Sequence, residues 1–139
     1  MRLIAVGHGR YASGLKSAVD MLSGDGEKLS SIDFAADVSP DEFERLLREA
    51  VDGDEAVIIC DLVGGTPYNR ACLLAHESES VRVVAGMNLA AALEAVLSLE
   101  DGARTAEIAE RLCSSVPDGV GRFEEGACSA DSVDEDEDL

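Results

Sequence analysis

Three short segments of the sequence each combine a polar side chain with small neighbours, a pattern typical of a site. They are Gly7-His8-Gly9, the run from Asp61 to Pro67, and Gly86-Met87-Asn88. Imidazole is a neutral nucleophile near pH 7, and a carboxylate bonded to one ring nitrogen fixes the tautomer and leaves the other nitrogen free to attack. We therefore predict that His8 is a nucleophile and that Asp61 orients it, as the third member of a catalytic triad does.

The segment Gly64-Gly65-Thr66 precedes a predicted helix and is suited to hold an anion. Backbone N–H groups at a helix start, the positive end of the helix dipole and the Thr66 hydroxyl all favour negative charge. Together with His8, this predicts a phosphohistidine site. The sequence has no lysine motif of the Walker type and no zinc-ligand spacing among its cysteines, so we expect neither a metal ion nor a cofactor.

Each of these features also has an ordinary explanation. A loop histidine is usually solvated, an aspartate such as Asp61 can cap a loop, and paired glycines can form a turn. We predict a partner-docking surface from the residues that flank the site, although surface packing explains them equally well: Arg10, Tyr11, Tyr68, Asn69, Met87 and Asn88. We expect His76, in a helical setting, to be an exposed residue without a role in the site.

Apolar runs alternate with helical stripes along the chain, which predicts an α/β fold. Strands are expected at residues 3–6, 29–34, 56–60 and 81–85, and helices at about 15–22, 40–53, 67–75, 89–99 and 105–116. Ser39 and Glu42 form a capping box, and Thr66 is expected to cap the third helix with Pro67 at its start. The fold we predict is a doubly wound, mostly parallel four-stranded sheet flanked by helices, with the first and third strands central.

This topology places the three polar segments together. In open parallel sheets, ligands bind beyond the carboxyl ends of the strands, where the winding reverses. His8 and Asp61 each follow a strand, and these two strands are expected to be neighbours. We therefore expect the two side chains to meet at one edge of the sheet.

Composition limits the classes of function. The 139 residues suffice for one domain, and 29 acidic against 11 basic residues give a formal net charge of -18. Phosphate backbones need a basic surface, so we do not expect nucleic-acid binding. No apolar run approaches the roughly 20 residues of a membrane-spanning helix, and no signal-peptide pattern occurs at the start. We expect a cytoplasmic protein without direct membrane insertion.

The charge is concentrated at one end of the sequence. From Glu124 onward there are eight acidic residues and no basic one. Like charges in such a run repel, so we predict a folded domain over residues 1–124 and an acidic, disordered tail over residues 125–139.

Three stretches resemble the signature sequences of a known family. Ile4-Ala5-Val6-Gly7-His8-Gly9, the run from Asp61 to Asn69, and Gly86-Met87-Asn88-Leu89 are similar to those of the mannose-type IIA component of the bacterial phosphoenolpyruvate-dependent sugar phosphotransferase system, which includes fructose and sorbose members. The similarity runs in order and spacing from about residue 1 to residue 123. Asp-x-x-Gly-Gly-Thr-Pro-x-Asn is its most specific stretch.

The resemblance implies a phosphocarrier. By position, His8 would accept a phosphoryl group from phospho-HPr and pass it to a IIB component, which acts with the membrane components IIC and IID in sugar uptake. Asp61 would be the hydrogen-bonded aspartate, with the phosphoryl group on the ring nitrogen turned away from it. Gly65 and Thr66 would lie against the phosphate.

The resemblance also implies a homodimer, in which a final strand can be exchanged between subunits. Residues 120–123 are the candidate for a short fifth strand of this kind. Two features depart from the family pattern: Gly7 stands where many relatives carry Ser or Thr, and the acidic tail is additional.

Two other functions remain open from the sequence. A related phosphohistidine subunit serves dihydroxyacetone kinase, although the Gly-Gly-Thr-Pro-x-Asn stretch favours the sugar branch. Alternatively, the chain is a non-catalytic regulatory or binding module of the same fold, in which His8 is a sensor or a relic.

Overall fold

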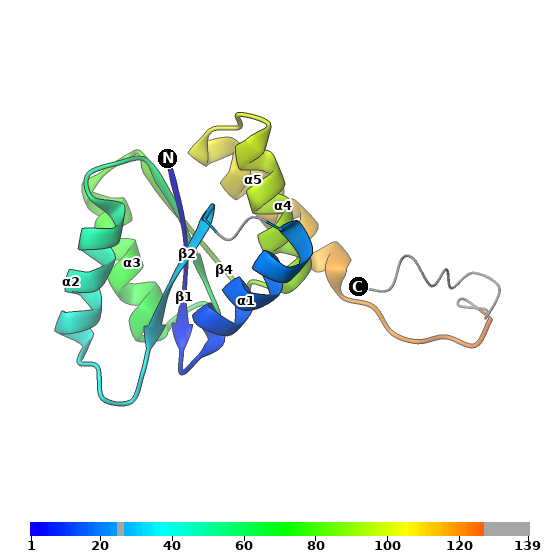
Figure 1. Ribbon diagram of the computed structural model, residues 1–139, viewed down its shortest axis with the longest axis horizontal. Coiled ribbons are helices and arrows are strands. Elements are labelled where there is room, and N and C mark those ends of the chain that lie inside the picture. The colour runs from blue at the N-terminus through cyan, green and yellow to red at the C-terminus, as the bar shows by residue number, and fades with distance from the viewer. Residues whose placement is uncertain (25–26, 127–139) are drawn as a thin grey trace.

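The computed structural model describes residues 1–24 and 27–126, in which four parallel strands form one sheet with helices on both faces (Figure 1). The strands are β1 (Arg2–His8), β2 (Leu29–Phe34), β3 (Ala56–Cys60) and β4 (Val81–Ala85). The helices are α1 (Tyr11–Ser23), α2 (Pro40–Val51), α3 (Gly65–Glu77), α4 (Leu89–Glu100) and α5 (Thr105–Ser115), followed by a 3-10 turn (Pro117–Gly119). The strand order β2-β1-β3-β4 confirms the predicted fold, with the first and third strands central.

The two central strands are apolar because helices cover both of their faces. Alternate residues of β1 and β3 enter two separate cores. Leu3 and Ala5 pack with α1, α4 and α5, whereas Ile4 and Val6 pack with α2 and α3. The two groups of helices lie on opposite sides of the sheet in Figure 1.

The strand β1 is longer than its apolar run predicts. It continues through His8, because β2 runs beside it far enough for His8 to lie opposite Phe34. On its other side β1 pairs with β3, and Val6 lies opposite Cys60. The sheet thus carries His8 to its carboxyl edge on a strand held from both sides.

Local hydrogen bonds set the starts of α1 and α2. The Ser39 hydroxyl accepts the Glu42 N–H at 3.1 Å, which confirms the predicted cap of α2. α1 has no cap from its preceding residue, and Asp33 of β2 takes that place by accepting the N–H and the hydroxyl of Ser13 at 2.9 and 2.6 Å. A residue distant in sequence therefore anchors the first turn of α1.

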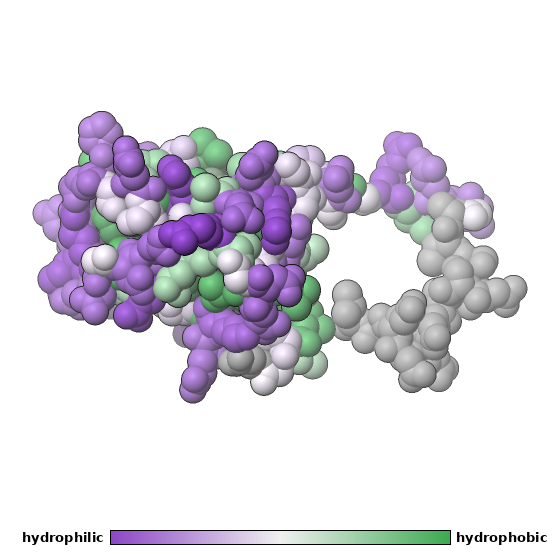
Figure 2. Space-filling model, turned by 90° about the horizontal axis from the view of Figure 1, so that it is seen from above, coloured by the Kyte–Doolittle hydropathy of each residue, from purple (hydrophilic) through white to green (hydrophobic). Residues whose placement is uncertain are grey.

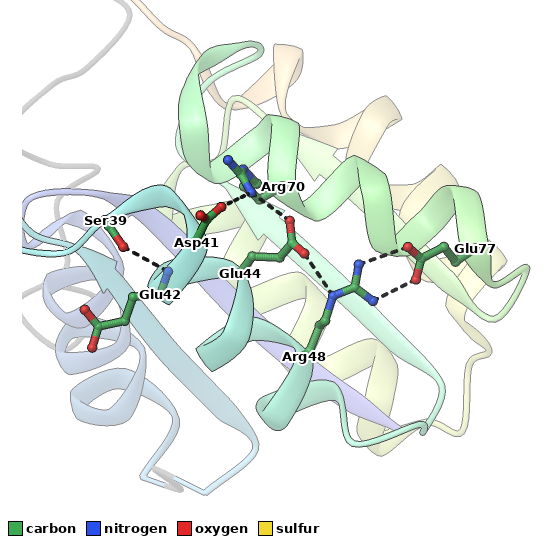
Figure 3. A network of polar contacts seen from close by, with 7 residues as sticks. All are labelled: Ser39, Asp41, Glu42, Glu44, Arg48, Arg70 and Glu77. Carbon is green, nitrogen blue, oxygen red and sulfur yellow. Dashed lines mark hydrogen bonds and ion pairs between the residues drawn. The ribbon is translucent and has the colours of Figure 1, made fainter.

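Alternating charges join α2 to α3 (Figure 3). Arg70 of α3 reaches Asp41 and Glu44 of α2, both at 3.0 Å. Arg48 of α2 binds Glu44 at 3.1 Å and holds both carboxylate oxygens of Glu77 at 2.7 and 2.9 Å. This ladder fixes α3, whose first turn lies at the carboxyl edge of the sheet, against its neighbour.

The start of α3 differs from the prediction. Thr66 is not the cap: the helix begins at Gly65, Gly64 occupies the cap position without a side-chain bond, and Pro67 is the third residue of the helix. Gly64 and Gly65 have φ angles of +86° and +78°, values that favour glycine. The two glycines turn the chain sharply enough to begin the helix earlier than a side-chain cap would.

The chain beyond α5 forms no strand within the described residues. After the 3-10 turn, residues 120–126 extend away from the body of the molecule (Figure 1). Val120 and Phe123 are exposed there, so the predicted fifth strand has no partner in the single chain. Residues 127–139, most of the predicted acidic tail, lie outside the described residues.

The end of the molecule at which the strands begin is largely hydrophilic (Figure 2). Ion pairs occur there, with Arg2 at 3.5 Å from Asp54 and Arg104 at 2.7 Å from Glu55. Within the described residues, no helix is long and apolar enough to cross a membrane. The predicted site lies at the opposite end of the sheet.

Candidate functional site

The carboxyl edge of the sheet brings the predicted nucleophile and its partner together. His8 is the last residue of β1, and Asp61 directly follows β3, the neighbouring strand. The Asp61 N–H continues the ladder between these strands by donating to the Val6 carbonyl at 3.2 Å. The expected contact between His8 and Asp61 is therefore confirmed.

One carboxylate oxygen of Asp61 receives two hydrogen bonds from His8. Oδ2 lies 2.7 Å from the ring Nδ1 and accepts the backbone N–H of His8 at 2.9 Å. Because an ionised carboxylate can only accept, Nδ1 carries the proton and Nε2 keeps its lone pair. The Asp61 side chain is 9% exposed and the His8 side chain 47%. Nε2 thus belongs to the more exposed of the two side chains.

The surroundings of Asp61 keep it ionised. Burial by itself raises the pKa of this carboxyl group. The N–H donors of His8 and Leu62 and the His8 ring lower the pKa by more than burial raises it, so it falls below its ordinary value. The Leu62 N–H donates to Oδ1 at 2.9 Å. A carboxylate held in this way can stabilise the positive charge that an imidazole gains on forming a bond through Nε2.

The first turn of α3 faces the free side of the His8 ring. A Cβ placed on Gly65 would lie 3.0 Å from Cε1 and 3.3 Å from Nε2 of His8. The backbone therefore approaches the ring as closely as a glycine allows. The first N–H groups of α3, at Gly65 and Thr66, have no partner within the helix, so an anion on Nε2 would meet donors and the positive end of a helix dipole.

An aromatic contact holds the ring from a third side. The rings of His8 and Phe34 meet edge to face with centroids 5.9 Å apart. Sequence reasoning missed Phe34, because its role depends on the register between β1 and β2, which places it opposite His8. The signal available was only that β2 ends in an aromatic residue.

The predicted docking residues divide into two groups. Arg10 and Asn69 are exposed, and Tyr11 and Tyr68 are half-buried. Met87, in contrast, is buried, and Asn88 caps α4 by accepting the Ala91 N–H at 2.9 Å. The side chains of these last two residues serve the packing and the start of α4.

Two apolar residues that the sequence reasoning did not single out are exposed beside His8. Leu62 and Val63 follow Asp61 directly, and Val63 is 72% exposed. The sequence places both residues in the segment that follows the strand, but an apolar pair in a loop does not by itself indicate whether it faces solvent or packs inward. His76 is exposed in the last turn of α3, the end of the helix away from His8, as expected.

Comparison with known proteins identifies the family. Residues 2–113 match the family described as "PTS system fructose IIA component". The chain is 30% identical over 103 residues to the fructose-specific EIIA component of Bacillus subtilis, covering 71% of this chain and 70% of that protein. It is 33% identical over 101 residues to the sorbose-specific EIIA component of Lacticaseibacillus casei, covering 70% and 73%.

A solved structure agrees with this assignment. The EIIA component from Streptococcus agalactiae superposes with a TM-score of 0.82 at 29% identity, over 88% of this chain and 96% of that chain. The fold and these matches define a phosphoryl-transfer component of a sugar phosphotransferase system. The chain belongs to the mannose-type IIA family, which includes the fructose and sorbose components, and the resemblance noted from three short stretches is confirmed.

Proposed function

We propose that this chain carries a phosphoryl group on Nε2 of His8, taking it from phospho-HPr and passing it to a IIB component of a sugar uptake system. The observation that carries the proposal is the 2.7 Å contact between Asp61 and Nδ1, which leaves Nε2 open toward the first turn of α3. The sugar-specific relatives support the choice of pathway. We further propose that the protein works in the cytoplasm, where these partners would meet it.

The transfer would be a displacement at phosphorus. The lone pair on Nε2 forms the new N–P bond while the N–P bond to the donor's histidine breaks, and its electron pair returns to the donor ring. Asp61 stabilises the positive charge that the His8 ring acquires, and the N–H groups of Gly65 and Thr66 neutralise phosphoryl oxygens. Because one phosphohistidine replaces another, the step needs alignment more than driving force.

The exposed residues around His8 provide a surface on which either partner could dock. Arg10 and Asn69, with half-buried Tyr68, come from the predicted docking set, and the exposed Leu62 and Val63 add an apolar contact. We propose that these five side chains align the partner's histidine or acceptor group with Nε2. Indirect action through IIC and IID needs no contact between this chain and the membrane.

Incubation with phosphoenolpyruvate, enzyme I and HPr tests the proposal. We expect a label that is lost in acid and stable in base, as a phosphohistidine is. His8→Ala should abolish it, and His76→Ala, the matched change at the exposed histidine, should leave it intact. A label that survives His8→Ala would refute the assignment.

The two alternatives give different outcomes in a second step. Phosphorylated protein is mixed separately with purified IIB component and with dihydroxyacetone kinase, and loss of the label is followed. Drainage by IIB alone supports sugar transport, whereas drainage by the kinase alone supports the other branch. A label that neither partner removes would favour a regulatory module.

We also propose that two copies of the chain pair through residues 120–123. Val120 and Phe123 are exposed on a segment that extends from the body, and unpaired sheet edges readily accept a strand from another chain. Light scattering should give a dimer for the full chain and a monomer after deletion of residues 120–139. A dimer that persists in the deletion would contradict strand exchange.

A further inference from the structure

Tyr11 links the start of α1, just after His8, to the loop that follows β4. It is the first residue of α1, and its hydroxyl donates to the backbone carbonyl of Met87, which follows β4. The two residues are 76 positions apart in sequence. Its ring is half-buried and packs against the core shared by α1, α4 and α5.

This bond closes a ring of contacts around the site. The Met87 N–H donates to the Cys60 carbonyl at 3.2 Å, and Cys60 directly precedes Asp61. Asp61 in turn binds His8, and the chain from His8 leads back to Tyr11. The ends of β1, β3 and β4 are therefore joined in one ring of contacts, and the Tyr11 side chain, which is not part of the proposed chemistry, completes it.

The ring of Tyr11 also fills the space beside Gly7. A Cβ placed on Gly7, which is buried, would lie 2.8 Å from Cδ1 of Tyr11 and 3.1 Å from both Cβ and Cγ of Asp61. Contacts below 3.0 Å are not tolerated by real Cβ atoms. The Tyr11 ring and the Asp61 side chain thus both border the space beside Gly7, and a Ser or Thr before His8 would force at least one of them to shift.

The ionisation of Tyr11 agrees with this packing. Burial, and then the negative charge of Asp61, raise the pKa of the Tyr11 phenol above its ordinary value of 10.0. The phenol therefore stays neutral at physiological pH and keeps the proton that it donates to Met87.

We propose that Tyr11 is a positioning residue, which together with Gly7 holds the Asp61 carboxylate in the orientation that bonds Nδ1 of His8. The inference rests on the proposed role of His8 and assigns to Tyr11 the task of keeping Nε2 unprotonated. It makes Gly7 and Tyr11 an interdependent pair, in which removal of the ring at position 11 relieves the closest contact, 2.8 Å, that a side chain at position 7 would make.

The experiment measures the tautomer of His8 directly. Nitrogen-15 NMR of the unphosphorylated protein reports which ring nitrogen carries the proton, and needs no phosphoryl donor. The variants are Gly7→Ala, Tyr11→Ala, the double variant and Tyr11→Phe. Gly14→Ala is the matched control, because Gly14 lies in α1 with nothing within 4 Å of an added Cβ. Circular dichroism establishes that each variant is folded.

We expect the wild-type protein and Gly14→Ala to carry the proton on Nδ1. In Gly7→Ala the two tautomers should mix, and transfer from phospho-HPr should slow by about tenfold or more. The double variant should recover Nδ1 protonation and part of the rate relative to Gly7→Ala. Tyr11→Ala should show a mixed tautomer, and Tyr11→Phe, which keeps the ring, should lose only about two- to fivefold in rate.

Two results would overturn the proposal. The first is that His8 carries its proton on Nδ1 in folded Gly7→Ala and in folded Tyr11→Ala, as in the wild-type protein. The second is that the double variant recovers neither Nδ1 protonation nor transfer rate relative to Gly7→Ala. If Gly7→Ala does not fold, the tautomers of Tyr11→Ala and the double variant decide. Failure of the wild-type protein to accept phosphate, with the tautomer changes present, would refute the proposed function and leave the positioning role of Tyr11 intact.

Discussion

At the scale of single residues, the orientation of one carboxylate governs the site. Asp61 Oδ2 is shared between the ring and the backbone N–H of His8, so the carboxylate cannot rotate without breaking both contacts. Its second oxygen is held by the N–H of Leu62. The geometry therefore selects one tautomer of His8 before any partner arrives, which is the kind of preorganisation that lowers a barrier.

Asp61→Asn should slow phosphoryl transfer to His8 by about 10- to 100-fold. The amide keeps the shape of the side chain but loses its charge, and its NH2 group can turn toward Nδ1 and favour the wrong tautomer. Transfer rates from phospho-HPr measure the effect, with Asp101→Asn at the exposed far end of α4 as the control. An unchanged rate for Asp61→Asn would show that Asp61 is structural.

Gly65→Ala should lower the transfer rate at least about 100-fold, because the new methyl group would lie against Cε1 and Nε2 of His8. Gly102→Ala is the matched control: its φ of +82° resembles the +78° of Gly65, but nothing lies within 4 Å of an added Cβ. Both variants should lose a similar ~1–2 kcal/mol of stability in urea unfolding. Equal transfer rates in the two variants would contradict the close approach.

The sequence is sufficient to predict the His8–Asp61 contact, because adjacent parallel strands end at the same edge of a sheet. It is not sufficient for Phe34 or for the bond from Tyr11 to Met87. Those contacts depend on strand register and on the path of a loop, which no short-range pattern encodes. The same limit applies to Met87, a predicted docking residue whose side chain packs in the core.

At the scale of elements, a helix start is predictable where a residue next to it in sequence caps it. The Ser39 cap acts within one turn of its own helix, and the start of α2 is where the sequence places it. At α3 the prediction assumed that a hydroxyl must begin the helix. Two consecutive left-handed glycines begin it instead, and Thr66 is left on the first turn, where its hydroxyl can face an anion.

The ion pair between Arg48 and Glu77 should make the contact of α2 with α3 sensitive to acid. The hydrogen bonds from Arg48 lower the pKa of Glu77 below its ordinary value of 4.5. A lowered pKa in the folded state means that the stabilisation is complete above pH 4.5 and is lost as the pH falls through the folded pKa.

Thermal unfolding of wild-type protein and Glu77→Gln checks this dependence. At neutral pH the wild-type protein should melt at a higher temperature than Glu77→Gln. The difference between the two melting temperatures should shrink to zero in acid. Glu79→Gln, a change at a nearby exposed position, should show no such dependence. A difference that persists unchanged below the folded pKa would mean that packing, and not charge, joins the helices.

At the scale of the whole molecule, the candidate site and the ion-paired end of the sheet lie opposite each other. The site lies at one end of the sheet, the opposite end is hydrophilic and carries ion pairs, and much of the net charge of -18 is at the carboxyl terminus of the sequence. The alternation of strands and helices predicts the sheet order, because short right-handed connections leave few topologies. Pairing with a second copy cannot be read in this way, since its surface is not defined by one chain.

Truncation after Glu125 should leave the rate of phosphorylation within about twofold of the full chain, because the sequence predicts that this run of like charges is a solvated extension. The rate of labelling by phospho-HPr measures this. The rate of phosphoryl transfer from the phosphorylated protein to IIB is measured as well, and it should be equally unaffected. A large loss in either step would assign the tail to the docking of that partner.

Phosphorus-31 and nitrogen-15 NMR of the phosphorylated protein test the central claim most directly, because they identify the atom that holds the phosphoryl group. The account predicts a single phosphohistidine at His8, bonded through Nε2, with Nδ1 still protonated and bound to Asp61. A phosphoryl group on Nδ1 of His8, or on any other residue, would contradict it.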